Sequence, residues 1–475
     1  MIGFYAVGML SPSIWIVYAM LLGALPLLAR TRAEAAALFI VATGAVPELV
    51  YPLQIGSLYL VAVDKWILLS IGLMAAVLFR RRAGPKAGMR FSLPYVIMLA
   101  LDLYVSRDDT VTATLRNVVG VLLAGGVGYF AFTNAISRIE DLRRVLLAFA
   151  YIGFVLSCVA VVEGFLHTLF YATMSAKLNI GGTPLYRLMK FRGGILRATT
   201  VYGDATTLAQ FLVVTLMATV TFRHNFRTTR ALGIALGVIT VGIFVTSTRN
   251  AWIGVLVGVM AFDLYRGRFL PLVGKVTLLG MMYGSVLLLA EFIPYFNAMV
   301  NGPDTTGTAN YRSLLLTRGM EEYHKHPLSG IAVKKLLIDM KDLVQGEGIV
   351  DFVNGYLFYA LADGLLGFIG LLLVFLLPCV AMLAIRRSMI ARGLLLERSA
   401  ALVFSVCLTY AVMTAFTGYG GHYEIPLYCI MGLGAVLFSW RRVAPARLNL
   451  GAANAAPPLA TLGPPAVAKP LIAVP

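Results

Sequence analysis

The stretch that decides the fold is LLGFIGLLLVFLLPCVAMLAI, residues 365–385, which contains no charged side chain. With a rise of about 1.5 Å per residue, a helix of this length crosses the roughly 30 Å of hydrocarbon in a bilayer. Shorter apolar runs, such as VITVGIFV at 238–245, recur along the chain. The strands of a membrane barrel would instead alternate apolar and polar residues over about 10 positions. The pattern predicts an all-α polytopic membrane protein.

The composition of the whole chain agrees with this prediction. Of 475 residues, 59% are apolar and 13% are charged, and the mean hydropathy is +0.84. An average soluble domain carries about 25% charged residues, so secreted, cytosolic and disordered classes are excluded. The formal net charge is +17, but Lys and Arg lie between the apolar runs, so no nucleic-acid partner is expected. The four cysteines fall inside apolar runs without CxxC spacing, which favours buried thiols over a disulfide or metal site. They are Cys158, Cys379, Cys407 and Cys429.

About 12–13 apolar runs are expected to be transmembrane helices. They lie near residues 12–29, 35–53, 57–79, 91–106, 117–136, 146–170, 205–222, 231–246, 250–265, 271–292, 353–385, 399–416 and 425–440. The first run lacks the basic start and the small-residue cleavage site of a signal peptide, so we expect it to be retained.

Short basic connections predict the orientation of these helices. They contain Arg30 and Arg32; Arg80, Arg81, Arg82, Lys86 and Arg90; Arg138, Arg143 and Arg144; Arg223, Arg227 and Arg230; Arg266 and Arg268; Arg386, Arg387, Arg392 and Arg398; and Arg441, Arg442 and Arg447. Counting through thirteen spans places all seven connections on one side, which the positive-inside rule assigns to the cytoplasm. The functional residues are then expected on the opposite side, near 107–116, 171–204, 246–250, 293–352 and 417–424.

Four regions are expected along the chain. Residues 1–292 would hold ten transmembrane helices and a basic outer loop at 171–204, and residues 293–352 would form a partly helical outer cap. Residues 353–443 would hold the last transmembrane helices. The tail at 444–475 is rich in Ala and Pro and is expected to be a disordered cytoplasmic end.

The loop at 171–204 is strongly basic although it lies on the predicted outer side, against the usual charge bias. Its basic residues, with no acidic residue before Asp204, are Lys177, Arg187, Lys190, Arg192 and Arg197. Guanidinium groups bind phosphate oxygens bidentately, so a pyrophosphate at the membrane surface would fit this loop. Attraction to anionic lipid headgroups is the alternative for Lys177, Arg187 and Lys190.

A lone arginine marks the turn at 246–252, which reads TSTRNAW. Placing Arg249 at membrane depth costs about 2.5 to 3.5 kcal/mol on insertion scales, so such a residue usually lines a cavity or meets an anion. The flanking hydroxyls, including Thr248, add polar groups. The alternative is a snorkelling anchor beside an interfacial Trp252.

The segment at 293–352 is expected to be amphipathic. A helix should begin near Asn310-Tyr311-Arg312 and end at Pro327. Leu316, Met320 and Tyr323 follow helical spacing within it. Taken alone, the segment could be a packing lid or a surface for a partner.

Four pieces of this sequence resemble, in order, the O-antigen ligase and polymerase superfamily of bacterial envelope glycosyltransferases. They are LRATTVYGDATTLAQFL at 196–212, TSTRNAWIGVLVG at 246–258, NYRSLLLTRGMEEYHKHPLSGI at 310–331 and VNGYLFYALADGLLGFIGLLL at 353–373. The resemblance covers roughly residues 190–380, whereas the first half of the chain matches only as a set of apolar runs.

The resemblance implies a GT-C-like enzyme of the bacterial inner membrane. It would transfer glycans from a polyprenyl-diphosphate carrier at the periplasmic face, with donor and acceptor both lipid-linked and without a metal or other cofactor. Arg197 and Arg249 match the positions that would hold the leaving diphosphate, and Arg312 would orient the acceptor or pin the cap. Further substrate contacts would come from Arg192, Thr248, Asn354 and Tyr356. A chain-length regulator protein and membrane lipid are the other implied partners.

One departure bears on the reaction. Ligases of this family commonly carry a His directly before the Asn of Asn-x-Tyr-Leu, and here that residue is Val353, which cannot accept a proton. The other outer-face candidates for a base are His326, His324, Glu347, Asp351, His422 and Glu424. His326 lies in the family's His-Pro-Leu motif, where a helix-end hydrogen bond is the alternative role. The missing histidine favours a polymerase over a ligase.

A transporter of polysaccharide lipids is the remaining alternative. It would need a charged path through the membrane. The intramembrane candidates for such a path are Asp64, Lys65, Glu163, His167 and Asp363. They lie in separate predicted spans, so local pairing inside the bundle is the simpler interpretation for Asp64 and Lys65, whereas Glu163 and His167 lie one helical turn apart and could border a sugar-binding cavity.

Overall fold

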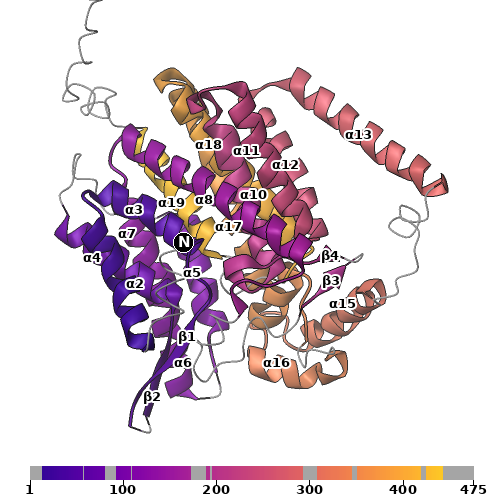
Figure 1. The fold of residues 1–475 in the computed structure, drawn as a ribbon. Coiled ribbons are helices and arrows are strands. Elements are labelled where there is room, and N and C mark those ends of the chain that lie inside the picture. The colour runs from indigo at the N-terminus through magenta and orange to yellow at the C-terminus, as the bar shows by residue number, and fades with distance from the viewer. Residues whose placement is uncertain are drawn as a thin grey trace, which may run out of the picture.

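The structure of the protein is a computed structural model that describes residues 13–56, 58–80, 92–108, 110–172, 189–192, 195–292, 308–344, 350–418 and 424–441. It is a helical bundle, about 79% helical, in which most helices run side by side (Figure 1). The predicted tail at 444–475, the middle of the basic loop and the first part of the 293–352 segment lie outside the described residues.

The first half of the chain contributes helices and one hairpin. Its elements are α2 (Ile14–Leu28), α3 (Arg32–Thr43), β1 (Val50–Ile55), β2 (Leu58–Asp64), α4 (Lys65–Phe79), α5 (Leu93–Val105), α6 (Val111–Val121), the π-helix η1 (Leu122–Val127), α7 (Gly128–Ala135) and α8 (Ile139–Leu166). Side-chain caps explain several of the helix starts. The Asp64 carboxylate accepts the N–H of Ile67 at 2.8 Å, and the Thr31 hydroxyl accepts that of Glu34 at 3.2 Å.

The second half continues the bundle and adds helices at one end of it. Its elements are β3 (Phe191–Arg192), β4 (Ile195–Leu196), η2 (Thr200–Tyr202), α10 (Ala205–Thr221), η3 (Arg223–Asn225), α11 (Thr229–Val245), α12 (Arg249–Arg266), α13 (Phe269–Phe292), α15 (Thr308–Lys325), α16 (Val333–Asp339), η4 (Lys341–Leu343), α17 (Gly355–Arg392), α18 (Leu394–Thr414) and α19 (Glu424–Trp440). Helix α18 packs against both α12 and α17, and α13 leans away from the bundle (Figure 1).

Among the described residues, four helical segments are long and apolar enough to cross a membrane. They are Val111–Ala135, Ile139–Leu166, Gly355–Arg392 and Leu394–Thr414. Six shorter apolar helices accompany them, among them α10 and α11. These properties are those of an all-helical membrane protein, and the predicted spans at 205–222, 231–246 and 250–265 coincide closely with α10, α11 and α12.

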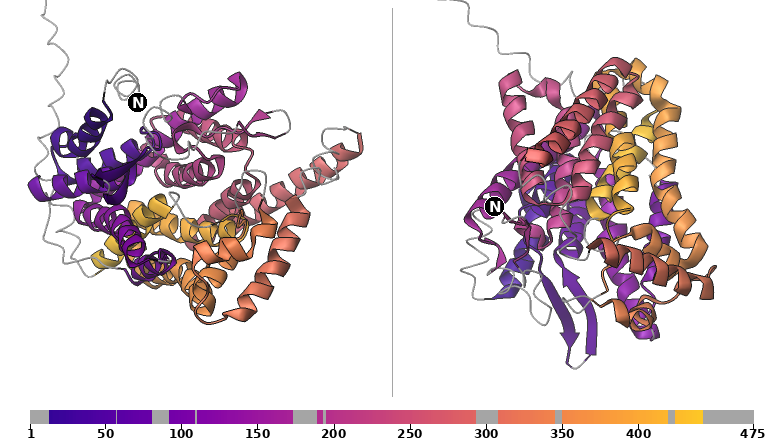
Figure 2. Two further views of the ribbon diagram at one scale, coloured as in Figure 1. Left: turned by 90° about the horizontal axis from the view of Figure 1, so that it is seen from below. Right: turned by 90° about the vertical axis from the view of Figure 1, so that its right-hand side faces the viewer.

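The predicted spans at 35–53 and 57–79 are wrong between residues 50 and 64. There the chain forms the antiparallel hairpin β1–β2, with Val50 opposite Asp64, and the hairpin extends beyond the ends of the helices (Figure 2). Pro52 has no N–H to donate within a helix, and Gly56 takes the left-handed conformation, φ 61°, that the turn requires. The segment is also rich in β-branched and aromatic residues, which favour strands.

The predicted loop at 107–116 is also shorter than expected. Helix α6 begins at Val111, where the Thr110 hydroxyl accepts the N–H of Ala113 at 3.1 Å as an N-cap. It continues through the π-helix η1 into α7, so the helical segment starts six residues before the predicted span at 117–136.

Helix α17 is broken at Gly364, which has φ 68°. The turn that follows α15 forms backbone hydrogen bonds with α17 at this break. Leu365 N–H donates to the Pro327 carbonyl at 2.8 Å, and Ile331 N–H donates to the Leu361 carbonyl at 2.8 Å. The interrupted helix thereby regains partners for backbone groups that a break leaves unpaired.

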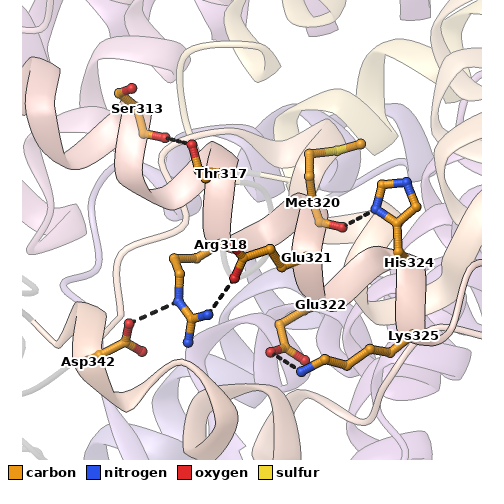
Figure 3. Close-up of polar contacts among 9 residues, drawn as sticks. All are labelled: Ser313, Thr317, Arg318, Met320, Glu321, Glu322, His324, Lys325 and Asp342. Carbon is orange, nitrogen blue, oxygen red and sulfur yellow. Dashed lines mark hydrogen bonds and ion pairs between the residues drawn. The ribbon is translucent and has the colours of Figure 1, made fainter.

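The α15–α16 segment has a small apolar core of its own. The buried residues of this core are Leu315, Ile331, Leu336, Met340, Leu343, Val350, Phe352, Leu357 and Leu361. On its exposed side, Arg318 joins α15 to η4, because its guanidinium contacts Glu321 on α15 and lies 3.1 Å from the Asp342 carboxylate in η4 (Figure 3). The segment is therefore a packed unit seated on the first turns of α17.

We expect Gly330→Ala to destabilise the protein. Gly330 has φ 62°, and a Cβ atom there would overlap the carbonyl of Ala362. A non-glycine residue in this conformation costs of order 1–3 kcal/mol before the overlap is counted, so the midpoint of thermal unfolding should fall by several degrees in detergent. Gly237→Ala in α11 is the matched control, since a Cβ there meets nothing within 4 Å. Equal midpoints for the two variants would contradict the backbone docking at the α17 break.

Candidate functional site

Arg197 is positioned by a short hairpin and bound to a distant turn. It follows β4, and its N–H donates to the Lys190 carbonyl at 2.9 Å. Its guanidinium donates from Nε to the Thr246 carbonyl and from Nη2 to the Thr248 hydroxyl, both at 3.2 Å. The end of the basic loop is thus attached to the turn that precedes Arg249.

Arg249 is the first residue of α12, and its side chain is exposed. The preceding residue, Thr248, makes no side-chain cap to this helix, because its hydroxyl accepts from Arg197 and lies 3.2 Å from the Thr246 carbonyl. The N-terminus of α12 therefore combines backbone N–H groups without a side-chain cap, the positive end of the helix dipole and an arginine. Each of these favours an anion.

A buried carboxylate holds the loop that carries Arg197. Glu163, near the end of α8, is 0% exposed. It accepts the N–H groups of Thr200 at 2.8 Å, Thr199 at 3.2 Å and Phe170 at 3.2 Å. The ring of His167 lies edge-on to that of Phe191 in β3, with 5.5 Å between centroids. Glu163 therefore stabilises the loop that carries Arg197, and His167 packs against the hairpin that precedes it.

The backbone around this site contains unusual conformations. Of the non-glycine residues that the structure describes, three have positive φ: His167 (50°), Thr200 (45°) and Ser247 (51°). All three lie in the segments that meet at Arg197. Such conformations cost of order 1–3 kcal/mol each and cluster at functional sites, so the turn at 246–250 and the loop before α10 have the features of a site.

A second set of contacts joins the arginine turn to the start of α17. The Asn250 amide donates to the Thr417 hydroxyl, after the end of α18. A Cβ at the adjacent Gly418 would lie 2.6 Å from the carbonyl of Phe352, so these backbones are in close contact. The residues just before α17, including Asp351, are thereby placed on the same side of the bundle as Arg249.

Asn354 and Tyr356 have structural partners in this arrangement. The Asn354 side chain caps α17 by accepting the N–H groups of Tyr356 at 3.0 Å and Leu357 at 3.2 Å. The Tyr356 hydroxyl donates to the Ala411 carbonyl at 2.8 Å. Both residues therefore fix the start of α17, and their predicted contact with substrate stays a prediction.

Arg312 and His326 lie at opposite ends of α15. Arg312 is exposed beside Tyr311, whose hydroxyl is 3.0 Å from both the N–H and the carbonyl of Asp351. Burial raises the pKa of Tyr311, so it remains a neutral donor at physiological pH. His326 is exposed near the α17 break, about 21 Å along the helix from Arg312.

The structure thus brings Arg197, Thr248 and Arg249 together and places His326 apart from them. His324, the other histidine of α15, has its Nδ1 atom 2.6 Å from the Met320 carbonyl (Figure 3). Several candidate residues lie outside the described part of the structure: the side chains of Arg192 and Glu424, and the whole of Lys177, Arg187, Glu347 and His422.

No group of three His, Cys, Asp or Glu side chains that could hold a metal occurs among those described.

Two of the intramembrane charges predicted for a transport path, Asp64 and Lys65, have local partners. Lys65 is 0% exposed and pairs with Glu48 at 2.8 Å, whereas Asp64 caps α4. Asp363 lies buried beside the α17 break. Neither oxygen of the Asp363 carboxylate has a hydrogen-bond partner among the described residues.

Sequence reasoning missed the residues that position the arginines. Glu48 N–H donates to the Val201 carbonyl at 2.9 Å, and the ammonium of Lys65 lies 4.8 Å from the ring of Tyr202. Thr417, the partner of Asn250, was equally inconspicuous. The only signal was the cost of a charged residue such as Glu48 in an apolar run.

We expect Glu163→Ala to loosen the loop at 197–202. Three backbone N–H groups would lose their acceptor, at about 1–3 kcal/mol for each buried donor left unpaired. Amide hydrogen exchange at Thr199 and Thr200 should therefore become at least about tenfold faster. Glu291→Ala, which removes an exposed carboxylate on α13, serves as the control. Unchanged exchange at both threonines would show that Glu163 does not hold this loop.

Comparison with known proteins adds no relative to this picture. A scan against protein-family models found no match, and a search of curated proteins found none either. The resemblance of four segments to the O-antigen ligase and polymerase superfamily therefore stays a prediction.

Proposed function

We propose that this chain is a glycosyltransferase of the bacterial inner membrane, built on a GT-C-like helical bundle. It polymerises polyprenyl-diphosphate-linked oligosaccharide repeat units into an exopolysaccharide or an O-antigen chain at the periplasmic face. The α15–α16 segment is its periplasmic cap. The partners are the lipid-linked donor and acceptor, the surrounding lipid and a chain-length regulator.

The observation that carries the proposal is the pairing of Arg197 with the turn that begins α12. Arg197 binds Thr246 and Thr248, and the next residue, Arg249, begins a helix without a side-chain cap. A diphosphate has the charge and the oxygen geometry that this set of donors can bind. The adjoining apolar helices suit the polyprenyl chain of the same molecule.

The reaction is a single displacement at the anomeric carbon. The acceptor hydroxyl oxygen forms the new glycosidic bond, and the bond from the anomeric carbon to the diphosphate oxygen breaks. The leaving diphosphate keeps that electron pair, and its growing negative charge is stabilised by Arg197 and Arg249. The proton of the acceptor hydroxyl passes to a base on the outer face.

A ligase that transfers the finished glycan to lipid A core or to protein is the second candidate. It shares the arginine site and the carrier, so the same geometry supports it. The residue before Asn354 favours the polymerase, because Val353 cannot serve as a base and packs against the apolar core of the α15–α16 segment. A polysaccharide-lipid transporter is less favoured, since Lys65 pairs with Glu48 and Asp64 caps α4.

We expect Arg249→Ala to abolish polymer formation. In a host that lacks this gene, the wild-type chain should restore polymer, whereas the variant should leave single repeat units on the carrier. Loss of one group that stabilises the leaving charge lowers the rate by about 100-fold or more. Polymer size is read on gels, and lipid-linked units by mass spectrometry.

Arg230→Ala is the matched control, an exposed arginine at the opposite end of α11 from the site. Both variants should reach the membrane fraction in wild-type amounts. Normal polymer from Arg249→Ala would refute the proposed role of this arginine. Long chains that stay on the carrier in the deletion strain would identify a ligase instead.

The position of the base can be tested in the same assay. Asp351 precedes Phe352, whose carbonyl contacts Gly418 beside the arginine turn. His326 instead adjoins Pro327, which binds Leu365 about 15 Å along α17 from the start of that helix. We therefore expect Asp351→Asn to slow polymer formation more than His326→Ala does. His324→Ala is the control for histidine loss on α15. A larger effect of His326→Ala would return the role of base to the His-Pro-Leu motif.

A further inference from the structure

Five arginines gather at the end of the bundle opposite Arg249. They come from η3, the α12–α13 connection, α17 and α18, and we call them the arginine cluster: Arg223, Arg266, Arg268, Arg386 and Arg398. The charges of Arg223, Arg266 and Arg268 all act on Arg398, which is 3% exposed. Arg386 reaches the same connection, with Nη2 2.8 Å from the place of a Cβ on Gly267.

The carboxylates near the cluster are already engaged. Both oxygens of Glu397 accept from Arg266, at 2.8 and 3.4 Å, and Asp263 pairs with Lys275. Within the described part of the chain, the other four arginines of the cluster have no ion pair. Like charges at partly buried positions repel, and an unpaired buried charge is costly.

The cluster also presents donors without acceptors. Arg398 Nε, Arg386 Nε and Arg266 Nη1 are buried and have no hydrogen-bond partner among the described residues. One further donor, Nη2 of Arg398, contacts Nε2 of His224. The charge of Arg398 lowers the pKa of His224, so this imidazole is a neutral acceptor and neutralises none of the positive charge.

We propose that the arginine cluster is a binding site for a phosphate-bearing anion. Guanidinium groups match phosphate oxygens bidentately, and one phosphate would supply acceptors to several of these donors while offsetting their repulsion. The sequence places this end of the bundle at the cytoplasmic surface, where anionic phospholipid headgroups lie. The site is separate from the proposed catalytic arginines, since α12 extends about 26 Å from Arg249 to Arg266.

The test uses the purified full-length protein in a neutral detergent. Bound lipid is measured by native mass spectrometry and the unfolding midpoint by a thermal scan, with phosphatidylglycerol, phosphatidylcholine or inorganic phosphate added. The double variant Arg223→Gln/Arg268→Gln removes two charges from the exposed side of the cluster. The control, Arg227→Gln/Arg230→Gln, removes two exposed charges, one just before α11 and one in its first turn.

We expect phosphatidylglycerol to bind and to raise the midpoint, and phosphatidylcholine to do neither. The double variant should bind phosphatidylglycerol about tenfold more weakly, whereas the control should bind as the wild type does. Protection by inorganic phosphate at equal concentration would identify a soluble phosphate as the ligand. Without ligand, the double variant should unfold at or above the wild-type midpoint, because repulsion is relieved.

Three results would overturn the proposal. The first is equal loss of binding in the control pair, which would show that only the net charge of this face matters. The second is the absence of any shift or bound species with either anionic probe. A double variant that unfolds early even without ligand would show that the arginines stabilise the fold directly, which also contradicts the proposed site.

Discussion

The carboxylate of Glu163 is buried and accepts three backbone N–H groups, and the arginine site depends on that arrangement. The loop before α10 crosses the end of the bundle, where backbone N–H groups have neither water nor a regular helix to bind. A single side chain with two oxygens provides their acceptors. Because the loop is held at Thr199 and Thr200, Arg197 is fixed in the position from which it reaches the turn at 246–248.

Helix positions were largely predictable from the sequence, because apolar runs in this chain are long and their ends carry basic residues. The hairpin at 50–64 was not, since a short apolar run is equally consistent with a buried strand or a helix. Pro52 and Gly56 were the local signals against a helix. The break in α17 at Gly364 is similar: the sequence shows a glycine in an apolar run, but only the docking of Pro327 and Leu328 reveals why the helix turns there.

The arginines of the candidate site were predictable from the sequence, whereas most of the residues that position them were not. Glu163 and His167 were noticed only as charges inside an apolar run. Arg197 and Arg249 stand out because positive charge at those positions runs against the charge bias of the chain. Glu48, Thr417, Thr200 and Ser247 carry no such mark, since their roles arise only from contacts between segments distant in sequence. Asn354 and Tyr356 illustrate the converse, because conspicuous motif residues have structural hydrogen bonds.

Helix α12 joins the two arginine-rich ends of the bundle, and the ends differ in a way that bears on function. At its C-terminus, Arg266 lies at the negative end of the helix dipole and pairs with Glu397. Both interactions are favourable for a cation, so this arginine stabilises the fold locally. At its N-terminus, Arg249 lies against the dipole and is exposed, in a turn where Ser247 is strained. Local physics therefore disfavours an arginine at this position. A bound anion would be attracted both by the positive end of the helix dipole and by Arg249. This is the physical reason for proposing that the diphosphate binds at the N-terminus of α12.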